Sequence, residues 1–151
     1  MQKLQSKVSL KSKVPSTSPG KILEIVIKIF YKTEIGQDLY ISGESSKLGN
    51  WNKTNLGLPL KWTKDHIWTG RFTPKDLPKL SNFKFIVKEK DDSITWEGGE
   101  DRIFDISKLT YAMKNSQNLK TQGWTELEKE RVHLELDSSK SVLTLSYKWE
   151  H

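Results

Sequence analysis

The chain from Lys21 onward is divided into short strand-like runs, separated by Gly, Asn, Asp or Pro about every ten residues. The first run, residues 22–32, has an alternating pattern that places Leu23, Ile25, Ile27, Ile29 and Tyr31 on one face of a strand. No run has the length or the periodicity of a helix. We therefore predict an all-β domain over residues 21–107, an antiparallel sandwich or barrel. Its further runs are 39–41, 58–62, 66–72, 83–90, 94–97 and 102–106.

Residues 108–151 follow this domain and contain two cleanly alternating runs, 132–136 and 143–149. A two-residue turn at Ser138-Ser139 would pair Leu134 with Leu143 in a hairpin over residues 131–149. We interpret 108–151 as a C-terminal extension with no evident place in the sandwich. Its deletion should leave ligand binding intact, and it is a candidate contact for a separate enzyme.

Two alternatives stay open for residues 108–130. Thr125-Glu126-Leu127-Glu128 has the spacing of a capping box, which could start a short helix running through Arg131. The hairpin would otherwise follow an irregular segment. Trp124 and Trp149 are expected to be packing residues.

The charge is concentrated at the start of the chain. The formal net charge is +6, and residues 1–20 contain four lysines and no acid, so about +2 remains for the rest by subtraction. We predict that residues 1–20 are a disordered basic leader. No apolar run is long enough to span a membrane, and no membrane partner is expected.

Cysteine is absent, which excludes disulfides, thiolate metal sites and thiol nucleophiles. His66, His133 and His151 are too scattered to form a zinc motif, so no cofactor is expected. A cytoplasmic location is the expectation. An organelle or plastid is the alternative, with the leader as a transit peptide.

Trp51 has an unusual setting for the largest apolar side chain. It lies in the turn-forming stretch Leu48-Gly49-Asn50-Trp51-Asn52-Lys53-Thr54-Asn55, without the alternating or helical pattern of a core tryptophan. An exposed position on a loop is the alternative to a core position.

Five motifs stand in a recognisable order and spacing across residues 21–107. They are Gly36-Gln-Asp-Leu-Tyr-Ile-Ser-Gly43, Leu48-Gly-Asn-Trp51, Trp68, Phe83-Lys84-Phe85-Ile86, and Thr95-Trp96-Glu97 with Asp101-Arg102. In this combination the chain resembles a starch-binding domain, a family-20 carbohydrate-binding module. The resemblance implies an immunoglobulin-like antiparallel β-sandwich that binds α-1,4-linked glucans, starch or glycogen, without catalysis.

The resemblance also implies the site residues. Trp51 and Trp96 stand at the positions of two exposed tryptophans, with Lys84, Glu97 and Asp101 as polar partners; Asp101 replaces the usual asparagine and so lacks an amide donor. A second site in this family centres on a tyrosine, which is Ile35 here. Trp62 and Trp68 are candidates for a substitute second platform.

Stacking on tryptophan suits a sugar, because one face of a pyranose ring carries C–H groups. Covering about 50 Å² at ~25 cal/mol/Å² contributes on the order of 1 kcal/mol per ring. Two rings predict weak, reversible binding, with a dissociation constant of roughly micromolar to millimolar.

Catalysis, protein interaction and nucleic-acid binding are the alternatives to glucan binding. The chain is not expected to be an enzyme, and any carbohydrate-active enzyme would be a separate partner. One alternative is a protein-interaction module that has lost sugar binding. A less favoured one is single-stranded nucleic-acid binding by exposed aromatics and lysines.

Overall fold

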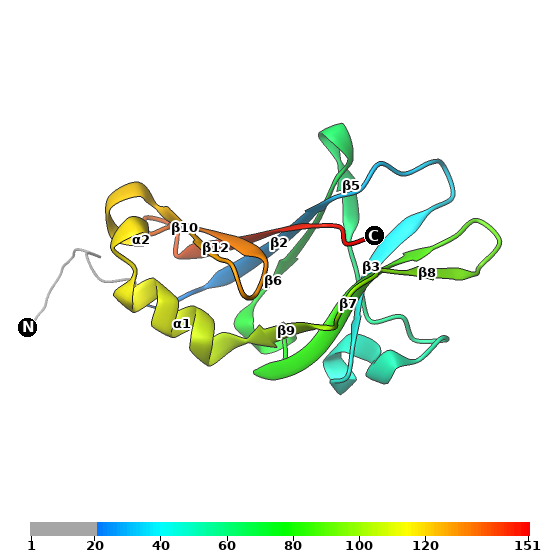
Figure 1. Cartoon of the computed structure of the whole chain (residues 1–151), viewed down its shortest axis with the longest axis horizontal. Helices are drawn as coiled ribbons and strands as arrows, with labels where there is room; N and C mark the ends of the chain where they lie inside the picture. Colours follow the sequence, from blue (N-terminus) through cyan, green and yellow to red (C-terminus); the bar gives the residue numbers. More distant parts are fainter. Residues whose placement is uncertain (1–20) are drawn as a thin grey trace, which may run out of the picture.

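The computed structural model describes residues 21–151, which form two β-sheets packed around a common core, with two short helices at one end (Figure 1). The expected all-β sandwich is confirmed. The leader predicted for residues 1–20 lies outside the described residues. Within residues 21–151, no helix is long and apolar enough to cross a membrane.

The first sheet has six strands in the order β10-β11-β12-β2-β6-β5. Neighbouring strands are antiparallel except β12 and β2, which run parallel with Leu143 opposite Ile25 and Lys148 opposite Phe30. The sequence predicted a wholly antiparallel sandwich, and the parallel pairing of β12 with β2 departs from that prediction. The strands are β2 (Glu24–Phe30), β5 (Lys61–Thr63), β6 (Ile67–Phe72), β10 (Trp124–Leu127), β11 (Val132–Asp137) and β12 (Val142–Lys148).

The second sheet has the order β4-β3-β7-β8, and the short strand β9 pairs with the start of β7. Three 3-10 turns connect the strands of the two sheets: η1 (Ser46–Trp51), η2 (Lys64–His66) and η3 (Pro74–Asp76). The strands are β3 (Asp38–Gly43), β4 (Leu58–Pro59), β7 (Leu80–Lys88), β8 (Ile94–Trp96) and β9 (Arg102–Asp105).

Alternate residues of both sheets fill the core. Ile25, Ile27 and Ile29 of β2 face it as the alternation predicted, and Phe83 and Phe85 of β7 meet them from the other sheet. Leu23, predicted on the same face, precedes β2 and is exposed. Residues beyond position 107 contribute as well: Leu109, Met113, Leu119, Val132, Leu134, Leu143, Leu145 and Tyr147 all belong to this core. The segment interpreted as an extension is thus part of the sandwich, because β12 lies between β2 and β11.

Two helices lie where the sequence left the structure open, α1 (Ile106–Asn115) and α2 (Gln117–Gln122). The Asp105 side chain caps α1 by accepting from the Lys108 backbone N–H, and Ser116 caps α2 through Leu119. Gly123, with φ at +83°, ends α2.

The helix considered for residues 125–131 does not form, because residues 124–127 are strand β10 and pair with β11. Thr125 faces inward and is buried, and Leu127 on the same face packs against the core, so tertiary pairing overrides the local capping pattern.

β11 and β12 pair antiparallel as the predicted hairpin, but the register differs by two residues. Leu134 lies opposite Leu145, and residues 138–141 form a four-residue connection after Asp137. The Asp137 carboxylate accepts from the backbone N–H groups of Ser139 and Lys140, and Ser141 adopts a φ of +57°. These local bonds favour the longer turn.

Candidate functional site

Trp51 ends the η1 turn, on the connection that leads from β3 to β4. Leu48, three residues before it, is buried and fixes the turn to the core. The Asn50 backbone N–H donates to the Ser45 carbonyl, and the Asn52 N–H donates to the Gly49 carbonyl at 2.9 Å. The turn is therefore held by its own backbone bonds, and Trp51 is only partly buried.

Three consecutive residues of this turn have left-handed backbone angles: Gly49 at φ +85°, Asn50 at +54° and Trp51 at +57°. Such angles are costly for residues other than glycine, at roughly 1–3 kcal/mol each where they persist. At Gly49 a Cβ atom would also lie 2.3 Å from the Asn55 carbonyl oxygen. The Gly49-Asn50 pair is therefore what this turn requires.

Trp96 comes to the same place from the end of β8. Its Cα partner on β7 is Ile86, so the two side chains lie on the same face of the sheet. This is the outer face, because Phe85 and Val87 on either side of Ile86 face the core. Ile86 is nevertheless fully buried, so other side chains of the outer face cover it. The Trp51 and Trp96 rings have centroids 5.9 Å apart and an interplanar angle of 52°. Trp96 is 41 % exposed. The two indoles form an angled, partly exposed aromatic pair.

Glu97 follows Trp96 and points the opposite way. Glu97 is 3 % exposed, and its carboxylate makes a bidentate pair with Arg102, at 2.9 Å to Nε and 2.7 Å to Nη2. The backbone N–H groups of Phe85 and Glu150 donate to its two oxygens. The expectation that Glu97 accepts from a ligand hydroxyl is corrected, since its oxygens are enclosed and already bonded.

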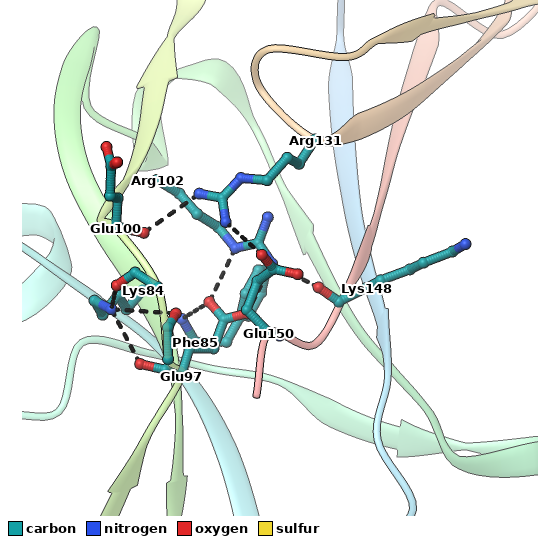
Figure 2. Close-up of polar contacts among 10 residues, drawn as sticks. Lys84, Phe85, Glu97, Glu100, Arg102, Arg131, Lys148 and Glu150 are labelled. Carbon is teal, nitrogen blue, oxygen red and sulfur yellow. Dashed lines mark hydrogen bonds and ion pairs between the residues drawn. The ribbon is translucent and has the colours of Figure 1, made fainter.

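Lys84 is also engaged inside the protein. Its Nζ donates to the backbone carbonyls of Glu97, Gly98 and Gly99, at 3.0, 3.4 and 2.7 Å (Figure 2). An ammonium has three protons, so all of its donors have partners. Lys84 therefore shapes the loop after Trp96, and its expected bond to a ligand hydroxyl stays a prediction.

The C-terminal residues brace this loop, a contact that the sequence did not indicate. Glu150 bonds Gly98 through its backbone carbonyl and Arg131 through its carboxylate, and Arg131 also donates to the Glu100 carbonyl (Figure 2). The Arg102 Nη2 donates to the Lys148 carbonyl at 2.6 Å. Asp101 lies at the end of the braced loop and is exposed, whereas Lys84 is half-buried and Glu97 is buried.

Aromatic rings pack against the Arg102 guanidinium. The rings of Phe85 and Tyr147 lie 5.4 and 5.1 Å from its carbon. Burial raises the pKa of the Tyr147 phenol well above its usual range, so this group is neutral at physiological pH. Arg102 is therefore enclosed by Glu97, two rings and the Lys148 carbonyl, which stabilise its charge.

A comparison with protein-family models matches residues 22–117 to the starch binding domain family CBM_20. The match covers more than half of the chain. The chain belongs to the starch-binding domain family.

Relatives of this starch-binding domain include much larger proteins. Over 96 residues, 60 % of this chain, it is 31 % identical to the AA13 family lytic polysaccharide monooxygenase A of Aspergillus terreus, covering 23 % of that protein. Over 75 residues, 49 % of this chain, it is 35 % identical to the thermophilic beta-amylase of Thermoanaerobacterium thermosulfurigenes, covering 13 % of it. The chain thus corresponds to less than a quarter of each.

Solved structures share the fold of this starch-binding domain. The glucoamylase of Hypocrea jecorina superposes with a TM-score of 0.54 over 96 % of this chain and 20 % of its own, at 14 % identity. The gamma-CGTase of alkalophilic Bacillus clarkii gives 0.53 over 85 % and 15 %, at 17 % identity.

The candidate second site of this starch-binding domain is only partly formed as expected. Trp68 is 4 % exposed and belongs to the core, so its proposed platform role is corrected. Trp62 is 48 % exposed; its Nε1 donates to His66 Nδ1 at 3.2 Å and the two rings meet edge to face. Of the two candidates, only Trp62 offers a surface.

Proposed function

We propose that this starch-binding domain binds α-1,4-linked glucans, starch or glycogen, by stacking glucose rings on Trp51 and Trp96, and that it has no catalytic activity of its own. The observation that carries the proposal is the angled pair of partly exposed indoles on the braced turn and loop. A curved glucan chain can lie across two planes that meet at an angle of 52°. Asp101 supplies an exposed acceptor for a sugar hydroxyl.

The rigidity of both supports favours binding. Trp51 is held by the backbone bonds of its turn, and the loop after Trp96 is held by Lys84 and Glu150. Preorganised side chains lose little freedom when a ligand binds. At on the order of 1 kcal/mol per stacked ring, the affinity of one site stays modest and depends on both indoles.

The test is retention of the full chain on granular starch and on glycogen, with elution by cyclodextrin or maltoheptaose. The Trp51→Ala, Trp96→Ala double variant should lose retention while its melting temperature stays close to that of the unchanged protein. Tyr111→Ala is the matched control, because Tyr111 is 69 % exposed on α1, away from the site. Retention of the double variant would place the site elsewhere.

Salt separates glucan stacking from the nucleic-acid alternative considered above. Binding to phosphates weakens steeply as salt rises, because counterions are released, whereas sugar stacking should be nearly constant. Competition by cyclodextrin distinguishes it from a protein-interaction module. The relatives that carry a matching segment include enzymes, which supports a role in bringing a carbohydrate-active enzyme to the polysaccharide.

A further inference from the structure

A second exposed aromatic pair lies on the outer face of the six-stranded sheet, beyond the residues that match the family. The Trp124 and His133 rings stack with centroids 5.3 Å apart and an interplanar angle of 20°. Trp124, expected to be a packing residue, is 40 % exposed. The register places Trp124 opposite Glu135 and Glu126 opposite His133, so all four side chains share one face.

The two glutamates hold the histidine ring in place. Glu126 bonds His133 Nδ1, and the Glu135 carboxylate lies 3.4 Å from Nε2. A ring fixed on both edges gives Trp124 a rigid backing. Trp124 is thus a preformed platform of the kind that loses little freedom on binding.

Hollows adjoin this pair on both sides. A groove of about 810 Å³ is lined by Lys28, Phe30, Arg131, His133, Lys148 and Glu150, among others. A smaller one of about 520 Å³ lies beside Trp124, Lys108 and Asn118. Glu126 and Glu128 line both.

The larger groove reaches residues that brace the candidate glucan site. Two of its lining residues, Arg131 and Glu150, are the ones that bond the loop after Trp96. Arg131 and Glu150 thus connect the groove beside His133 to the loop that follows Trp96.

We propose that Trp124, backed by His133, is an outer contact for a long α-1,4-glucan chain that also occupies Trp51 and Trp96. This inference rests on the function proposed above and extends it to a preference for long chains. The face carries carboxylate acceptors at Glu126 and Glu135, a lysine donor at Lys28 and the amide of Asn118, which suit hydroxyl groups. Its glutamates disfavour an anionic ligand such as a phosphate chain.

The experiment compares the affinity of the full chain for maltotriose and for a linear amylose fragment of tens of glucose units, by calorimetry. Trp124→Ala should lower affinity for the long chain by about five- to tenfold, the effect of one lost stacking ring. Its affinity for maltotriose should stay unchanged. Trp124→Phe should recover most of the loss, and Tyr111→Ala should bind both ligands normally.

Two outcomes overturn the inference alone. The first is unchanged long-chain affinity in Trp124→Ala while the Trp51→Ala, Trp96→Ala variant loses binding. The second is an equal loss for maltotriose and amylose, which would mean a structural effect on the first site. If the unchanged protein binds neither ligand, the proposed function itself fails and this inference fails with it.

Discussion

Glu97 and Arg102 form a bidentate ion pair that is almost fully buried, one residue after the exposed Trp96. The pair joins three parts of the chain, because Glu97 also accepts from Phe85 and Glu150, and Arg102 donates to the Lys148 carbonyl. The exposed ring and the buried carboxylate alternate along the same strand end, so the ion pair fixes the base from which Trp96 projects.

Removing one charge of this pair should therefore destabilise the protein and weaken glucan binding. Glu97→Gln leaves the Arg102 guanidinium buried without an opposite charge, at a cost of about 3–5 kcal/mol in the free energy of unfolding. Urea unfolding measures the loss. The matched control is Arg71→Gln, which breaks the exposed pair with Glu24 and should change stability by less than ~1 kcal/mol. Similar effects from both substitutions would contradict this assignment.

Deletion of residues 108–151 should abolish folding rather than spare glucan binding, the reverse of the expectation from sequence. The deletion removes β12 from between β2 and β11 and takes with it buried residues such as Leu143, Leu145 and Tyr147. At roughly 1.5–3 kcal/mol each, the eight core side chains beyond residue 107 contribute on the order of 10–20 kcal/mol, at least as much as the whole stability of a typical domain. Circular dichroism with thermal melting would show it: a cooperative transition in the truncated chain would be contrary evidence.

Gly49→Ala should destabilise the protein more than Gly99→Ala does, because it disturbs the turn that carries Trp51. Both glycines have positive φ, but a Cβ at Gly49 meets the Asn55 carbonyl oxygen at 2.3 Å, while at Gly99 the nearest atom is 3.8 Å away. Gly99→Ala should cost about 1–2 kcal/mol from its backbone angle alone, and Gly49→Ala clearly more, with weaker starch retention. Equal melting temperatures would argue against the close approach.

Trp62 and Trp68 should respond oppositely to truncation. Trp68→Ala empties a core position and should cost about 3–5 kcal/mol, whereas Trp62→Ala should leave stability nearly unchanged, since Trp62 is 48 % exposed at the edge strand β5. If Trp62 is a second platform, its variant lowers retention on granular starch without affecting maltotriose binding. Strong destabilisation by Trp62→Ala would assign it to the core instead.

The Asp137 turn should contribute stability that depends on pH. Bonds from the Ser139 side chain lower the pKa of this carboxyl, so the ionised form is favoured in the folded state. Its contribution is present above the unfolded pKa of about 3.9 and disappears as pH falls through the lower folded value. Asp137→Ala should thus melt earlier than the unchanged protein at pH 7, and the difference should shrink toward pH 3. A constant difference across this range would exclude the carboxylate as its cause.

The alternation of the strands and the turn-bound Trp51 were readable from sequence because each depends on nearby residues. Ile25, Ile27 and Ile29 face the core as their spacing predicted. The burial of Glu97 was not readable, since one of its partners is the Glu150 backbone N–H, 53 positions away, and its ion-pair partner Arg102 is itself bonded to the distant Lys148 carbonyl. The role of residues 108–151 was missed for the same reason: a parallel pairing between β2 and β12 leaves no local signal.

That parallel pairing has a practical consequence for engineering. Leu23 bonds Ser141 at one end of the sheet, while Glu150 bonds Gly98 beside Trp96 at the other, roughly 20 Å apart along a seven-residue strand. A domain fused ahead of residue 21 would be attached at the end of the sheet that is farther from Trp51 and Trp96. One joined after His151 would crowd them, so tethers and affinity tags belong on the amino-terminal side.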